Sequence, residues 1–219
     1  MFTQIMKKGL FLIAILLVPS VVYLLFSLGQ HNTARLGYYG EVESISENGD
    51  TVFQSVPFPD LVTQNGNSMD VSNLNGRVLV VDIFDQPCDA ACYDKISTLN
   101  NYLNRIGLNE EWMLLSISMK PMEMGALKNL SEKNLYKGGN WMFATAKSQS
   151  DIDELVERLF VTTGQMGSVN DIPSTKVVVL DQNQRIREFF DLRLQQDNKT
   201  LQDAIKLLIQ EPHISWKER

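Results

Sequence analysis

Short apolar runs alternate with amphipathic stretches through most of the chain. Three nearly continuous apolar runs of strand length predict strands buried on both faces of a sheet: Arg77–Phe84 (RVLVVDIF), Trp112–Ile117 (WMLLSI) and Thr175–Leu180 (TKVVVL). Trp141–Phe143 predicts a shorter strand, and the polar turn signal at 64–67 predicts a hairpin. A second polar turn at 181–184 predicts a reversal into a strand over Arg185–Phe190.

The segments between these strands have apolar residues at helical spacing. They predict a helix from Asp89 that ends at Gly107, one over Pro121–Asn134, one capped by Ser150, and a last one over about Asn198–Gln210. Strands that alternate with helices indicate an α/β fold, a mixed sheet with helices on both faces.

A long apolar segment precedes this pattern. Residues 9–29 contain no charged residue and are long enough to span a bilayer as a helix, and Lys7 and Lys8 before them place residues 1–8 in the cytoplasm. The alternative is a cleaved signal peptide, although the run is long for one. The expected order is a cytoplasmic N-terminus, a transmembrane helix at 9–29, a polar spacer at 30–50, one domain over 51–212 and a tail at 213–219.

The charge balance bears on the partners. The 219 residues carry a net charge of −6, which does not favour nucleic acid as a partner, because phosphate binding needs surplus Lys and Arg. The predicted transmembrane segment makes the membrane an expected partner instead. Export also places the only two cysteines outside the cytoplasm, where they can oxidise.

Cys88 and Cys92 are the candidate reactive residues of the chain. They lie four residues apart at the predicted start of a helix, so they share a helix face, at a Cα separation near 6 Å that a disulfide can bridge. The helix N-terminus favours a thiolate, at least at Cys88. The alternative is an inert local disulfide, but one that encloses three residues stabilises the chain little.

The sequence around this pair resembles the Sco (SenC) family of thioredoxin-fold assembly proteins. The segments that carry the resemblance are Phe58-Pro59-Asp60-Leu61, Gln64-Asn65-Gly66, Leu74-Asn75-Gly76-Arg77-Val78, the VVDIF run leading into Pro87-Cys88 and Cys92, Leu115-Ser116-Ile117-Ser118, Trp141, Val179-Leu180-Asp181-Gln182 and the C-terminal helix. The resemblance implies a thioredoxin-like fold, copper or thiol handling during cytochrome oxidase maturation, and a bacterial inner-membrane protein with its soluble domain in the periplasm.

The chain also departs from that family. Copper-binding members use a histidine just before the third core strand, where this chain has Pro173. The only histidines, His31 in the spacer and His213 after the last helix, are interpreted as solvated residues. Asp89-Ala90-Ala91 lacks the prolines usual between the cysteines, and Lys120-Pro121 replaces an Asp-Pro. Pro173 instead resembles the cis-proline of thioredoxins, which faces the cysteines; the alternative is a trans proline that ends a loop.

Three functions follow from these residues. The first is a thiol–disulfide oxidoreductase or electron-transfer protein, in which Cys88 attacks, Cys92 resolves the mixed disulfide and Pro173 shapes the docking groove. The second is a Cu(I) chaperone that binds copper through Cys88, Cys92 and a third ligand other than histidine. Met119, Met122 and Met124 supply soft thioether sulfurs, or simply fill gaps. The third is a non-catalytic interaction module. The missing histidine favours redox chemistry, with a thiol-bearing or copper-site client such as an oxidase subunit.

Overall fold

The computed structural model describes residues 17–19, 36–45, 49, 51–70, 74–85, 88–106, 110–134, 139–169 and 175–213. The chain divides into two units, Met1–Arg35 and Leu36–Arg219, and the account below concerns the second. Within the part of the chain that the structure describes, no helix combines the length and the apolar composition that a membrane crossing needs. Of the predicted anchor at 9–29, only Leu17, Val18 and Pro19 fall among the described residues, so the anchor stays a prediction.

Seven strands among the described residues form one mixed sheet, in the order β4-β3-β7-β6-β5-β8-β9. The parallel strands β5, β6 and β7 form its centre, and β3 and β8 join them in antiparallel pairs. The strand bounds are β3 Leu61–Thr63, β4 Ser68–Met69, β5 Val78–Phe84, β6 Trp112–Ser118, β7 Trp141–Ala146, β8 Lys176–Leu180 and β9 Ile186–Asp191. The three predicted core strands and the two predicted turns are therefore confirmed.

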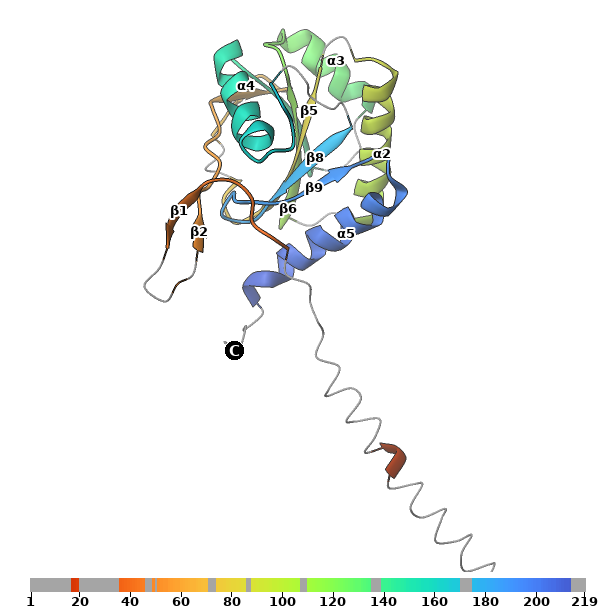
Figure 1. Cartoon of the computed structure of the whole chain (residues 1–219). Coiled ribbons are helices and arrows are strands. Elements are labelled where there is room, and N and C mark those ends of the chain that lie inside the picture. The colour runs from red at the N-terminus through yellow and green to blue at the C-terminus, as the bar shows by residue number, and fades with distance from the viewer. Residues whose placement is uncertain are drawn as a thin grey trace, which may run out of the picture. The chain divides into compact units, whose positions relative to one another are not determined.

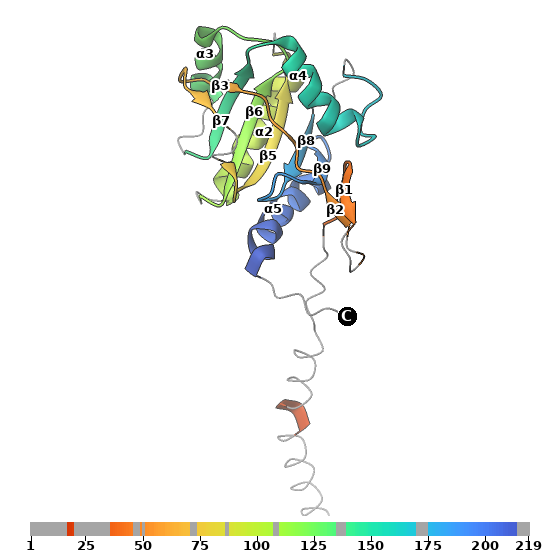
Figure 2. The same ribbon diagram turned by 90° about the vertical axis from the view of Figure 1, so that its left-hand side faces the viewer.

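Helices cover both faces of this sheet (Figure 1). On one face lie α2 (Ala90–Ile106), α3 (Met124–Asn134) and α5 (Gln195–Gln210), which ends in the short 3-10 helix η3 (Glu211–His213). On the other lies α4 (Gln149–Val156), which continues as the π-helical turn η2 (Glu157–Val161). Figure 2 shows the same layers after a quarter turn. The expected mixed sheet with helices on both faces is confirmed.

Strand β5 shows why the sequence folds in this way. All seven of its residues are buried. Leu79, Val81 and Ile83 belong to the core that contains α4, whereas Val78, Val80 and Phe84 belong to the core that contains α2 and α5. Alternate side chains of a strand point to opposite faces, so a continuous apolar run is what a central strand between two helical layers requires.

The helix starts differ from the prediction by a few residues, and α5 begins at Gln195 rather than at about Asn198. The Oγ atom of Ser148, not of Ser150, caps α4, because it accepts a hydrogen bond from Asp151 N at 3.2 Å. Helix α3 begins at Met124 rather than Pro121, since the backbone N–H of Met122 is bonded to Thr145 Oγ1 of β7 at 3.1 Å. This bond ties Met122, in the segment before the helix, to the sheet.

The segment predicted as a spacer also contributes structure. Within it, β1 (Val42–Ile45) pairs antiparallel with β2 (Thr51–Phe53) in a separate two-stranded hairpin (Figure 1). The chain is held just before this hairpin by Arg187 of β9, which is 1% exposed. Its guanidinium donates to the carbonyls of Leu36 and Gly37 and pairs with Glu211 of η3. The entry of the chain into the domain is therefore fixed by a buried, fully engaged arginine.

Candidate functional site

The cysteine pair follows the C-terminal end of the central strand β5. Strand β5 ends at Phe84, and Cys88 and Cys92 form a disulfide with a Cα separation of 5.3 Å. The two sulfur-bearing residues are unequal in access, because Cys88 is half-buried and Cys92 is only 3% exposed. A thiol reagent or client thus reaches this pair from the Cys88 side.

The start of α2 differs from the expectation in one respect. The helix begins at Ala90, so Cys88 precedes it and only Cys92 lies within it. Asp89 is the capping residue between them: its Oδ1 accepts a hydrogen bond from Cys92 N at 2.9 Å, and its carbonyl accepts one from Tyr93 N at 3.0 Å. The disulfide therefore bridges the first turn of the helix across its cap, and a carboxylate holds the backbone N–H of Cys92.

A charged pair lies in the core behind the disulfide. Lys95 of α2 and Asp82 of β5 form an ion pair at 2.6 Å, with side chains 1% and 0% exposed. Lys95 Nζ also donates to the carbonyl of Ile83 at 2.7 Å, and Ser116 Oγ donates to Asp82 Oδ2 at 2.8 Å. Trp141 Nε1 in turn donates to Ser116 Oγ at 3.0 Å. Since Lys95 is one turn after Cys92 on the same helix face, this network supports the helix that carries the site.

Other ion pairs occur at this end of the sheet, near the surface. Lys120, just after β6, pairs with Asp85, just after β5, at 3.0 Å, and both side chains are more than half exposed. At the end of β9, Arg193 pairs with Asp191 at 2.5 Å. This hydrogen bond from Arg193 lowers the pKa of Asp191 to about 2, although partial burial opposes the shift.

The lowered pKa of Asp191 predicts an acid-dependent stability. A carboxyl with a depressed folded-state pKa stabilises the fold fully above its unfolded pKa of about 4, and this contribution is lost as the pH falls through about 2. We expect Asp191→Asn to lower the free energy of unfolding at pH 7 by roughly 1 kcal/mol, a discounted figure because Arg193 is largely exposed. Urea unfolding at pH 7 and pH 2 checks this.

The difference between wild type and Asp191→Asn should shrink markedly by pH 2, where about half of the Asp191 carboxyls in the folded protein are protonated. Asp203→Asn, a matched change at an exposed residue of α5, should leave stability unchanged at both pH values. An Asp191→Asn effect as large at pH 2 as at pH 7 would contradict the assignment.

The three methionines proposed as soft ligands separate in the structure. Met122 packs against the same core cluster as Cys88 and Cys92. Met119 packs against the cluster on the opposite face of the sheet, and Met124 Cε lies near Gly66 in the β3–β4 turn. Of the three, Met122 is therefore the thioether that shares a cluster with the cysteines.

Other predicted site residues fall outside the described part of the chain. Pro173 and His31 belong to undescribed segments, and His213 ends η3 without a described side chain. The cis-proline and the interpretation of both histidines thus stay predictions. Among the described residues, no cluster of three or more His, Cys, Asp or Glu residues could hold a metal ion. A thioether sulfur is not among those residue types.

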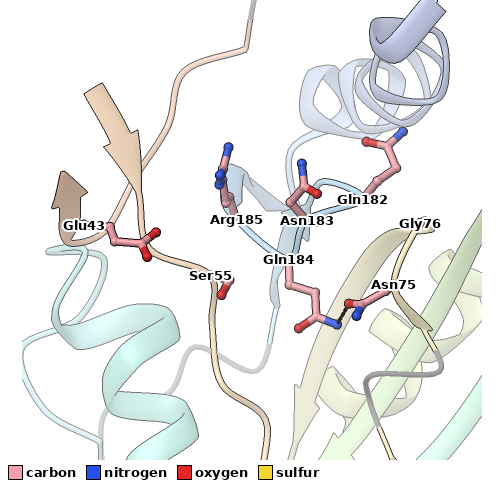
Figure 3. Close-up of a pocket in the computed structure, with 8 residues that line it drawn as sticks. All are labelled: Glu43, Ser55, Asn75, Gly76, Gln182, Asn183, Gln184 and Arg185. Atoms are coloured by element: carbon pink, nitrogen blue, oxygen red, sulfur yellow. Dashed lines mark hydrogen bonds between the residues drawn. The ribbon is translucent and has the colours of Figure 1, made fainter. Parts of the chain in front are cut away.

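The structure also has a polar pocket of about 490 Å³ at the other end of the sheet (Figure 3). It lies before the start of β5 and after the end of β8, whereas the cysteines follow the end of β5. Its lining consists of Glu43, Ser55, Asn75, Gly76, Gln182, Asn183, Gln184 and Arg185. Gln184 Nε2 donates to Asn75 Oδ1 at 2.8 Å, so a hydrogen bond links two of these side-chain amides. This lining contains neither a cysteine nor a histidine, and we take the cysteine end as the functional site.

Fold and site together define a class of protein. A central β5–α2 unit with a disulfide at the helix start, parallel strands beside it, and a β8–β9 hairpin followed by a C-terminal helix make a thioredoxin-like fold that carries a disulfide beside its central strand. No protein-family model and no curated protein sequence matches the chain. Solved structures do match it, and proteins of the Sco type are among them.

Three of these structures illustrate the similarity. A SCO1/SenC family lipoprotein from Bacillus anthracis is 19% identical, with 70% of this chain and 94% of that one covered and a TM-score of 0.58. BsSco, a cytochrome c oxidase assembly protein with a disulfide switch, is 17% identical, covers 71% and 93%, and has a TM-score of 0.58. Yeast Sco1 with copper bound is 17% identical, covers 76% and 97%, and has a TM-score of 0.54. The resemblance seen in the sequence is thus confirmed at the level of the fold.

Proposed function

We propose that the chain is a divergent Sco/SenC protein that acts as a thiol–disulfide or electron-transfer factor in maturation of the copper site of a respiratory oxidase. One observation carries the proposal: a disulfide at the first turn of α2 whose Cys88 is accessible and whose Cys92 is buried. Such a pair suits an exchange reaction in which the accessible cysteine attacks and the buried one resolves. The Sco-type neighbours support the oxidase setting.

The location belongs to the same proposal. Residues 1–8 lie in the cytoplasm, 9–29 cross the inner membrane, 30–50 connect to the domain at 51–212, and 213–219 form a tail. The apolar composition of 9–29 and the two lysines before it support this order. A lipoprotein neighbour is consistent with work at a membrane surface.

A trapping experiment tests the redox function. In Cys92→Ser the resolving thiol is absent, so a client attacked by Cys88 stays attached as a mixed disulfide. Expressed full-length in a respiring bacterium, this variant should accumulate an adduct with an oxidase copper-site subunit that dithiothreitol releases. The Cys88→Ser/Cys92→Ser chain is the matched control. An adduct that persists in the control, or no adduct with Cys92→Ser, would overturn the proposal.

A Cu(I) chaperone is the second candidate, favoured by the position of Met122 in the cluster of the two cysteines. Copper would be the cargo, held by two thiolates and a thioether, all soft donors. Titration of the reduced chain with Cu(I) against a chelator of known affinity separates the functions. Tight one-to-one binding that is lost in Cys88→Ser and weakened in Met122→Leu would support a chaperone. No binding would sink that candidate and leave redox exchange.

A further inference from the structure

Asp89 is next to Cys88 in the sequence and is hydrogen-bonded to the backbone of Cys92. It lies between them, its carboxylate is exposed, and its Oδ1 accepts from Cys92 N at 2.9 Å. The carbonyl of Asp89 accepts the first intrahelical bond, from Tyr93 N. The residue therefore closes the turn that carries one sulfur and stands next in sequence to the other.

The cap acts on a turn whose shape decides whether the disulfide can close. With a Cα separation of 5.3 Å, Cys88 and Cys92 are at bonding distance only while the first turn of α2 is formed. Burial of Cys92 in the core and the hydrogen bond from its N–H to Asp89 both stabilise that turn, beside the backbone bond from Tyr93 N. Cys88 has no such hold within the helix, because it precedes the first helical residue.

We propose that Asp89 is a positioning residue for the redox pair: its hydrogen bond to Cys92 N keeps the dithiol in the geometry from which the disulfide closes. This inference rests on the proposed redox function. In the closing step the Cys92 thiolate attacks the Cys88 sulfur of a mixed disulfide. The Cys88–Cys92 bond forms and the bond between Cys88 and the client sulfur breaks. The client sulfur leaves as a thiolate, which then takes up a proton.

The consequence is a measurable equilibrium. In glutathione buffer the dithiol plus one glutathione disulfide gives the internal disulfide plus two glutathione thiols. If the two thiols are already held at bonding distance, the equilibrium constant for forming the internal disulfide is larger. Loss of an N-cap typically weakens a helix start enough to change such a constant about fivefold. For a two-electron couple, a fivefold change is about 20 mV.

The test compares four variants of the full-length chain in glutathione buffers by acid quench, alkylation and mass. Asp89→Ala should lower the exchange constant about fivefold, which raises the reduction potential by about 20 mV. Asp89→Asn and Asp89→Ser keep a capping oxygen without the charge and should stay within about twofold of wild type. Asp94→Ala, the same substitution at an exposed site of α2, should have no effect.

The outcomes separate this inference from the function on which it rests. Wild-type exchange together with an unchanged Asp89→Ala constant would overturn the positioning role and leave the redox function standing. Equal shifts in the Ala, Asn and Ser variants would also overturn it, since they would point to the charge rather than the cap. A wild-type pair that does not exchange with glutathione would overturn the redox function itself. Circular dichroism of each oxidised variant confirms that it is folded.

Discussion

Lys95→Met should destabilise the protein by about 3–5 kcal/mol, because it leaves the carboxylate of Asp82 buried without its counter-charge. Both side chains are almost completely enclosed, and the ion pair spans β5 and α2, the two elements that place the cysteines. Met preserves most of the apolar stem of lysine, so the loss reports the charge rather than the volume. Urea unfolding of the full chain, with both cysteines oxidised, measures the change.

The double variant Asp82→Asn/Lys95→Met separates charge from packing. A neutral amide needs no counter-charge and can still accept the hydrogen bond from Ser116 Oγ. We expect the double variant to recover at least about 2 kcal/mol of the loss in Lys95→Met. Lys128→Met, which breaks the exposed pair with Glu132, should cost no more than about 0.5 kcal/mol. A double variant as unstable as Lys95→Met would contradict the account of this pair.

The two cysteines should behave unequally when each is removed. Cys92→Ser keeps the accessible thiol of Cys88, so it should form a stable adduct with one glutathione. Cys88→Ser keeps only a thiol that is 3% exposed, and a buried thiol is inert, so no adduct should form during the time in which Cys92→Ser reacts fully. Intact-protein mass after incubation with glutathione disulfide distinguishes the two results.

The outcome that would contradict this division of roles is an adduct at Cys92 that forms as fast as the one at Cys88. Denatured protein supplies the control, because both single-cysteine variants should then react at similar rates. The contrast between native and denatured rates therefore measures how far the fold itself assigns the roles.

Much of this site could be predicted from the sequence because its main determinants are local. The apolar run of β5 and the helical spacing after Asp89 are sufficient to place Cys88 and Cys92 at a strand–helix junction. The four-residue spacing then predicts a Cα separation close to the observed 5.3 Å. The family resemblance, carried by short segments, predicts the thioredoxin-like topology that the structure has.

What the sequence did not reveal depends on contacts between distant elements. The sequence alone does not show the partner of Lys95, and only the proximity of β5 reveals that it pairs with Asp82, 13 positions earlier. The charged residue Asp82 within the VVDIF run did indicate a buried ion pair, since an aspartate in a buried strand needs a partner. The cap at Asp89 could also have been predicted from the sequence, because Asp is favoured at the residue before a helix. The sequence could not predict that Met122 and Met119 pack on opposite faces of the sheet, since this depends on where each side chain lies in the folded domain.

The central claim is that Cys88 and Cys92 form a reversible redox couple in the folded protein. Equilibration of the full chain across graded glutathione ratios, followed by acid quench, alkylation and mass analysis, tests it most directly. We expect one reversible two-electron transition, at a potential above the roughly −300 mV below which structural disulfides lie, with unchanged circular dichroism. A disulfide that stays oxidised throughout this range, and is reduced only when the chain unfolds, would contradict the claim.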